Sequence, residues 1–198
     1  MTAPTSALER IIRRGSTQRE EAGPRCEVCN APVPAGHRHL LDTGESVVLC
    51  VCQACSLLFS QEAASKGHYR LVPQRRTRLS PVPTKDLGVP VGLAYFVLRG
   101  DGAVIAHYPS PAGATQWEVD PQAWACTVEG CPTLRTLAPD VEALLVNTAR
   151  GQQHHWLVPI DDCMRLVAVV REHWKGLSGG SQVWPQIERF FAELTEQR

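Results

Sequence analysis

The sequence predicts an α+β protein in which a four-cysteine metal-binding ribbon precedes a domain of antiparallel strands and C-terminal helices. Two Cys-x-x-Cys pairs, Cys26 with Cys29 and Cys52 with Cys55, lie close together in the first third of the chain. In the sequence that follows, strand-like runs are joined by tight-turn signals. These connections are too short for βαβ crossovers, which favours an antiparallel sheet. Residues 1–80 carry 11 basic and 7 acidic side chains, whereas residues 81–198 carry 9 and 13. This asymmetry also indicates two differently built parts.

The overall composition excludes several classes of protein. The chain has 198 residues, 43% of them hydrophobic, and a formal net charge of zero, so it presents no long-range field to nucleic acid or an anionic membrane. Its apolar runs are far shorter than the roughly 20 residues that a membrane helix needs, and residues 1–8 lack a signal-peptide pattern. We therefore expect a soluble cytoplasmic protein, in which clustered thiols favour metal ligation over disulfides.

Residues 1–25 predict a short N-terminal helix followed by a polar connector. Ser6 and Glu9 have the spacing of a capping box, and apolar side chains follow on one face within the first fourteen residues. A helix of this length needs a partner to persist.

Residues 26–72 predict the metal-binding ribbon. Strand-like runs at 39–41 and 46–51 flank the tetrad 42–45, Asp-Thr-Gly-Glu, which is a hairpin turn signal. Residues 61–72 predict a short helix and then a strand that closes the module.

Residues 73–90 predict a linker, because four prolines interrupt any regular helix or strand ladder. Arg70, Arg75, Arg76 and Arg78 lie in or beside this stretch. We expect them to be solvated, and contact with phosphate is the alternative.

Residues 91–198 predict the α+β domain. The expected elements are a hairpin at 91–98 and 103–108, a short helix around Trp124 with Asp120 as its N-cap, a second hairpin at 141–148 and 155–160, a helix at 161–175 capped by Asp161, and a last amphipathic helix from 181 onward. Residues 111–115 read as a turn rather than a phosphate cradle.

The two cysteine pairs predict one metal site with Cys26, Cys29, Cys52 and Cys55 as ligands. Each pair can curl around an ion, and two pairs across a hairpin complete a tetrahedron of sulfurs that suits zinc or iron. Zinc is favoured, because Asn30 and Ser56 follow the pairs where a one-iron, rubredoxin-like centre would carry glycine or aromatic residues. Such a closed site usually stabilises a small fold and performs no chemistry.

Three further residues lie beside this predicted site. Cys50 alternates with Cys52 along a strand, so it either packs beside the metal or substitutes for Cys52 as a ligand. His37 and His39 also alternate on one face. With four thiolates available, we expect them to lie at the surface or around the ligands, and ligand substitution is the alternative.

The other cysteines give weaker signals. Cys126, Cys131 and Cys163 are expected to pack as small apolar side chains. A nucleophilic role for Cys163 at a helix start, paired with a nearby histidine, has no local support, so no catalytic residue is predicted.

Several motifs resemble an uncharacterised family of actinobacterial proteins of about this length, over nearly all of residues 26–195. They are the cysteine module together with GHRHLLD (36–42), GHYRLVP (67–73), VGLA (91–94), YPSPAGAT (108–115), DVEALL (140–145) and LVPID (157–161). Genes of that family often lie beside those for nickel-iron hydrogenases and a scaffold-like iron-sulfur assembly protein. The resemblance therefore implies a role in building or protecting a hydrogenase, and it carries over no catalytic residue. The architecture is also similar in outline to accessory proteins that join a rubredoxin module to an assembly-chaperone domain.

These observations lead to three hypotheses about function. The first is a non-enzymatic zinc-binding accessory protein that docks on a hydrogenase subunit or maturation factor. The second is a one-electron carrier or oxygen-protection protein with a single iron in the same four cysteines. The third is nucleic-acid binding through the ribbon and the arginine-rich stretch.

Overall fold

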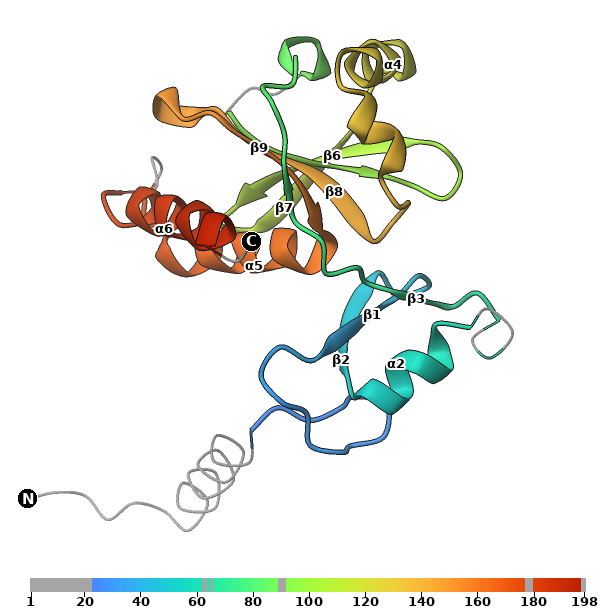
Figure 1. The fold of residues 1–198 in the computed structure, drawn as a ribbon. Helices are drawn as coiled ribbons and strands as arrows, with labels where there is room; N and C mark the ends of the chain where they lie inside the picture. The colour runs from blue at the N-terminus through green and yellow to red at the C-terminus, as the bar shows by residue number, and fades with distance from the viewer. Residues whose placement is uncertain (1–22, 62–63, 65, 89–91, 177–179, 197–198) are drawn as a thin grey trace, which may run out of the picture. The chain divides into compact units, whose positions relative to one another are not determined.

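A computed structural model of the protein describes residues 23–61, 64, 66–88, 92–176 and 180–196 (Figure 1). The chain divides into two compact units, Met1–Leu71 (unit 1) and Val72–Arg198 (unit 2). The predicted α+β class, with antiparallel sheets and C-terminal helices, is confirmed. The helix expected within residues 1–14 lies outside the described residues, as do three positions (62, 63 and 65) of the helix expected after Gln61.

Unit 1 contains a small antiparallel sheet and one helix. The sheet has the order β2-β1-β3. The elements are β1 (Arg38–Asp42), β2 (Val47–Val51), α2 (Gln53–Phe59) and β3 (Tyr69–Leu71). The hairpin turn predicted from Asp42 onward is present, because the Asp42 carboxylate accepts hydrogen bonds from the backbone N–H groups of Gly44 (2.9 Å) and Glu45 (3.1 Å).

The core of unit 1 lies on one face of this hairpin. Leu40 and Val51 are fully buried there, and Leu49 packs against them. Cys26 and Cys55 belong to the same apolar cluster. A core this small buries little apolar surface, so a further cross-link such as a metal ion would contribute substantially to its stability.

Unit 2 is built on a six-stranded antiparallel sheet of order β4-β9-β8-β5-β6-β7. The strands are β4 (Thr77–Arg78), β5 (Leu93–Leu98), β6 (Val104–Ser110), β7 (Gly113–Glu118), β8 (Glu142–Asn147) and β9 (His154–Pro159). Both predicted hairpins are present as β5–β6 and β8–β9.

Helices cover both faces of this sheet (Figure 1). They are α4 (Pro121–Gly130), α5 (Ile160–His173) and α6 (Val183–Glu196), with short 3₁₀ helices η1 (Lys85–Leu87), η2 (Pro132–Thr136) and η3 (Ala149–Gly151). α4 lies on one side, while α5 and α6 lie together on the other. Asp120 caps α4 as predicted, its carboxylate accepting from the Ala123 N–H at 2.9 Å.

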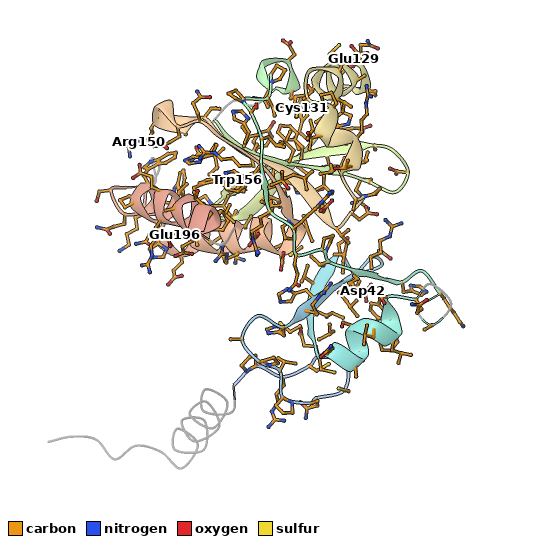
Figure 2. All side chains as sticks on the ribbon, in the orientation of Figure 1. Asp42, Glu129, Cys131, Arg150, Trp156 and Glu196 are labelled. Atoms are coloured by element: carbon orange, nitrogen blue, oxygen red, sulfur yellow. The ribbon has the colours of Figure 1, made fainter. Side chains whose placement is uncertain are left out.

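Because helices cover both faces of the sheet, strand β8 is buried on both sides. All six residues of β8 are buried, since their alternating side chains enter an apolar layer on each face. Leu144 and Val146 pack with Phe96 and Trp124 in the layer beneath α4. Trp156 on the adjacent strand β9 is fully buried within unit 2 (Figure 2).

Residues 73–90 differ from the linker that we expected. Thr77 and Arg78 form β4, which pairs with Leu157 and Trp156 at the edge of the sheet. Farther along, Val82 and Leu87 are buried in the core beneath α4. Pro73, Pro81 and Pro83 therefore lie in an edge segment that packs on unit 2, a position in which missing backbone donors are tolerated.

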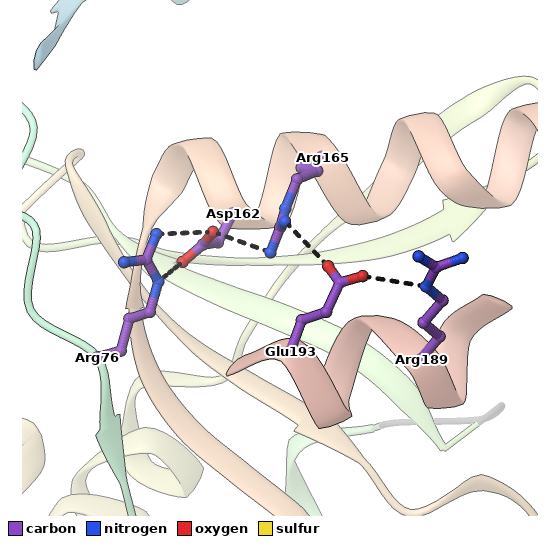
Figure 3. A network of polar contacts seen from close by, with 5 residues as sticks. All are labelled: Arg76, Asp162, Arg165, Arg189 and Glu193. Atoms are coloured by element: carbon purple, nitrogen blue, oxygen red, sulfur yellow. Dashed lines mark hydrogen bonds and ion pairs between the residues drawn. The ribbon is translucent and has the colours of Figure 1, made fainter. Parts of the chain in front are cut away.

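Two arginines of this segment pair with buried carboxylates, which also differs from the solvated role expected for them. Arg76 donates to Asp162 in the first turn of α5 (Nε–Oδ2 2.6 Å, Nη2–Oδ1 3.1 Å). Asp162 also pairs with Arg165, and the network continues through Glu193 to Arg189 on α6 (Figure 3). Asp162 thus joins the edge segment to the helical layer.

Two local expectations in unit 2 are corrected. The turn expected over residues 111–115 is confined to Pro111 and Ala112, because Gly113–Glu118 forms strand β7, which pairs along β6. α5 begins at Ile160, one residue before the predicted cap, so Asp161 lies inside its first turn. No helix in the described part of the chain has the length and apolar character needed to cross a membrane.

Candidate metal centre

The side chains of Cys26, Cys29, Cys52 and Cys55 come together in unit 1. Their four sulfur atoms all lie within 4.8 Å of one another. The Sγ atoms of Cys29 and Cys52, which come from different pairs, are 3.7 Å apart. Tetrahedral zinc with bonds of about 2.3 Å sets neighbouring sulfurs about 3.8 Å apart. The four-cysteine cluster can therefore bind a metal ion.

The first pair is positioned by a tight turn ahead of β1. The Cys26 carbonyl accepts from the Asn30 N–H, and the Cys26 N–H donates to the Ala31 carbonyl, both at 2.8 Å. Asn30 closes the turn in the left-handed conformation with φ 61°, which asparagine tolerates better than most residues. The turn directs the sulfurs of Cys26 and Cys29 toward one point.

The second pair is positioned by the start of α2. Cys52 is the N-cap residue, and its sulfur accepts the Cys55 N–H at 3.4 Å. Its carbonyl accepts the Ser56 N–H at 2.9 Å, which begins the helical hydrogen-bond pattern. Placing a thiolate at a helix N-terminus is favourable, because the unpaired N–H groups there stabilise negative charge.

Hydrogen bonds between Glu27 and the backbone of Cys50 hold the first cysteine pair close to the second. Its backbone N–H donates to the Cys50 carbonyl at 2.8 Å, and its carboxylate accepts the Cys50 N–H. The turn that contains Cys26 and Cys29 is thereby fixed beside the end of β2, from which Cys52 follows.

The cluster lies at the edge of the unit 1 core. Cys26 and Cys55 are buried, Cys52 is half-buried and Cys29 is exposed. An ion bound here would have apolar packing on one side and solvent on the other.

The environment separates the acidities of these thiols. Burial opposes ionisation of Cys26, but the backbone N–H groups of Cys52, Cys29 and Val28 outweigh it and lower the Cys26 pKa to about 6. Burial, followed by the neighbouring sulfurs, raises the pKa of Cys55 to about 12. Without a cation, the Cys26 thiolate therefore forms readily, whereas ionisation of Cys55 is opposed. A bound divalent cation would favour the thiolate form of all four cysteines by offsetting part of their combined negative charge.

His37, His39 and Cys50 form a second group, separate from the four-cysteine cluster. The strand alternation predicted that Cys50 would lie beside Cys52 on one face. Instead, β2 ends at Val51 and Cys52 already belongs to the α2 cap, so the two sulfurs join different groups. The signal for this second group was present in the sequence as the His-x-His and Cys-x-Cys spacings.

The remaining cysteines join neither group among the described residues. Cys126 is exposed, Cys131 is half-buried and Cys163 is fully buried in α5. Burial, reinforced by the charges of Asp162 and Asp161, raises the pKa of the Cys163 thiol well above its usual value. A buried thiol that resists ionisation is a poor nucleophile.

Comparison with known proteins identifies a family but no characterised relative. The sequence profile of a family of unknown function (DUF5947) matches residues 25–198. Searches of the curated proteins and of the solved structures found no match.

Proposed function

We propose that this chain, which belongs to the family of unknown function DUF5947, is a non-enzymatic accessory protein that holds one zinc ion in unit 1 and docks on a partner protein. The observation that carries the proposal is the closed donor set of four cysteine sulfurs. Four thiolates complete the coordination of zinc, so the ion would stabilise the fold and leave no position for a substrate.

Zinc is proposed because of the ligands and their surroundings. Four thiolates suit zinc and iron alike. The residue after each pair is polar, however: Asn30 closes the first turn, and the Ser56 hydroxyl donates to the Gln53 carbonyl at 2.8 Å. This differs from the glycine or aromatic surroundings expected of a one-iron centre.

The proposed docking surface is the outer face of α2. Leu57 and Leu58 are 64% and 56% exposed, and they follow Cys55 within one turn of the helix. Because α2 starts at two of the proposed ligands, metal binding would order this apolar pair. Adjacent exposed leucines are suited to burial in a protein interface.

The proposed partner is a hydrogenase subunit or maturation factor. This part of the proposal rests on the resemblance noted above, through the genes that accompany the family, and on no individual residue. Co-purification of tagged protein from cells that produce the hydrogenase tests it. We expect recovery of a hydrogenase subunit or a maturation factor with the wild-type chain.

The matched variants are Leu57→Ser/Leu58→Ser and Trp117→Ser. The double variant should lose the partner, whereas Trp117→Ser, which removes a 66% exposed side chain of unit 2, should retain it. Repeated failure to recover either kind of protein with the wild-type chain would reject the partner.

The exposure of Cys29 supports a second candidate, a one-electron carrier with a single iron. An exposed ligand offers a short path for an electron from the metal to another protein. Elemental analysis and an optical spectrum of protein purified without added metal separate the two functions. Stoichiometric zinc without visible absorption would exclude the electron carrier, and stoichiometric iron with a visible band would exclude the zinc proposal.

A further inference from the structure

His37, His39 and Cys50 bring three metal-ligating side chains together on one face of the β1–β2 hairpin. The register pairs His39 directly with Cys50, so their side chains leave the same face. His37 lies two residues before His39, and the two rings pack edge to face with centroids 4.8 Å apart. One ligand atom from each of the three residues lies within 4.8 Å of the other two.

His37 is oriented as a metal ligand would be. Its Nδ1 atom lies 3.0 Å from the Pro34 carbonyl, which can only accept a hydrogen bond, so Nδ1 carries the proton and Nε2 carries the lone pair. Nε2 is buried and has no hydrogen-bond partner among the described residues. A buried unpaired nitrogen costs free energy that a bound cation would recover. Metal-binding histidines commonly donate their second N–H to a backbone carbonyl in this way.

This group is structurally separate from the four-cysteine cluster. Leu40, Leu49 and Val51 lie on the opposite face of the hairpin and pack with Cys26 and Cys55 in the core. The backbone of Cys50 is held by Glu27 through both its N–H and its carbonyl. Cys50 therefore cannot replace Cys52 as a ligand without breaking these bonds and the cap of α2.

We propose that His37, His39 and Cys50 form a second metal site for a zinc-class divalent cation that accepts both imidazole and thiolate ligands. The ligands are His37 Nε2, a ring nitrogen of His39 and Cys50 Sγ, with a fourth position open to water or an exchangeable ligand. Three nitrogen and sulfur ligands with one open position are the pattern of zinc sites that exchange ligands. This site goes beyond the proposed function, which requires only the closed four-cysteine site.

The surroundings allow such an ion to enter and be held. All three residues are half-buried and His37 Nε2 itself is buried, so the group lies just beneath the surface of unit 1. Zinc bonds of about 2.1 Å to nitrogen and 2.3 Å to sulfur set ligand atoms roughly 3.6 Å apart. The side chains would therefore close inward by about one ångström, through rotation on a hairpin whose backbone is already fixed. Cys50 would release its thiol proton on binding.

Metal stoichiometry of the full, untagged chain tests the site. The metal-free protein is titrated with Zn²⁺ against a competing chromophoric chelator, and we expect two equivalents per chain, the second bound more weakly. The His37→Ala/His39→Ala variant should bind one equivalent with the first affinity unchanged. The control His68→Ala, which removes an exposed histidine of the same unit, should still bind two.

Cadmium provides a readout that does not depend on a substituted protein remaining folded. ¹¹³Cd NMR of the wild-type chain should show two resonances, one in the four-sulfur range and one displaced toward mixed nitrogen and sulfur ligation. Cys50→Ser should displace or remove only the second. A single bound equivalent in the wild-type chain, or a second equivalent that persists in the double histidine variant, would overturn the inference.

Discussion

Arg75 forms a two-pronged ion pair with Glu142, whose side chain is fully buried at the start of β8. The arginine Nε lies 2.5 Å from Oε1, and Nη2 lies 2.7 Å from Oε2. The carboxylate also accepts the Ala138 N–H at 2.8 Å. Both oxygens of a buried negative charge are thereby satisfied, and the charge is balanced by a residue from the edge segment.

Replacing Arg75 with methionine should destabilise unit 2 by about 3 kcal/mol, because it leaves the Glu142 carboxylate buried without its cation. The free energy of unfolding can be measured with urea. Tryptophan fluorescence reports unit 2 selectively, since all five tryptophans lie between positions 117 and 184.

The control for this prediction is Arg189→Ala. Arg189 pairs with Glu193 on the surface of α6 and is 74% exposed, so its loss should cost less than about 0.5 kcal/mol. Equal effects of the two substitutions would contradict a special role for the buried pair.

This ion pair also shows why the sequence predicted a solvated linker where the structure has a segment that packs on unit 2. Prolines and arginines are locally typical of a solvated connector. The carboxylates that hold Arg75 and Arg76 lie 67 and 86 residues farther along the chain. No local pattern identifies such partners, whereas apolar periodicity indicates the strands of unit 2 directly. The hairpins were therefore predictable, and the edge segment was not.

Gly92→Ala should destabilise unit 2 by about 2–3 kcal/mol. Gly92 has φ 70°, and a Cβ atom there would lie 2.7 Å from the backbone nitrogen of Ala149, which cannot move aside as a flexible side chain would. Gly102→Ala is the control, because Gly102 has φ 92° but no atom within 4 Å of the added carbon. Urea unfolding followed by tryptophan fluorescence should show only backbone strain, about 1 kcal/mol, for the control.

Unit 2 should lose stability as the pH falls from about 6.5 to 4, in part through His107. Burial, aided by the charge of Arg99, lowers the His107 pKa to about 4, and the neutral ring stacks on Tyr95 with centroids 4.6 Å apart. In the unfolded chain the imidazole titrates near 6.5, so between these values the unfolded state binds more protons. The contribution is complete above about 6.5 and disappears as the pH falls through 4.

The measurement compares wild type with His107→Gln. Urea unfolding at pH 7.5, 5.5 and 4 should give a shallower decline for the variant, by about 2 kcal/mol across the range. His154 and His155, whose pKa values are also lowered by burial, remain in both proteins, so the difference isolates His107. Parallel pH profiles would contradict the prediction.

The four converging cysteines of the candidate metal centre could be predicted from the sequence, whereas the structure around them could not. The spacing of the two Cys-x-x-Cys pairs predicted which sulfurs converge, since two such turns across a hairpin have few other arrangements. Helix α2, which begins at Gln53 after the Cys52 cap, was not predicted, and Cys50 was expected beside the four-cysteine cluster but groups with His37 and His39. Its grouping with His37 and His39 depends on where β2 ends and on the cross-strand register, which turn signals specify only within a residue or two.

Cys52→Ser should abolish metal binding by the four-cysteine cluster and loosen residues 26–71 while unit 2 stays folded. Cys52 supplies one proposed ligand and also the sulfur that caps α2; serine keeps an oxygen that can accept the Cys55 N–H, so the substitution removes the ligand and leaves the helix cap in place. In a module with so small a core, metal binding and folding are coupled. Amide hydrogen exchange should increase throughout unit 1, elemental analysis should show loss of the tightly bound ion, and tryptophan fluorescence should keep its wild-type urea midpoint.

Cys126→Ser is the matched control, because Cys126 is an exposed thiol outside both metal-ligating groups. It should change neither the metal content nor the exchange rates of unit 1. If Cys52→Ser retained the ion and its protection from exchange, three sulfurs would be sufficient and the closed site would be rejected. If the urea midpoint of unit 2 fell as well, the two units would not fold independently, and the stabilising effect of the ion would extend to the whole chain.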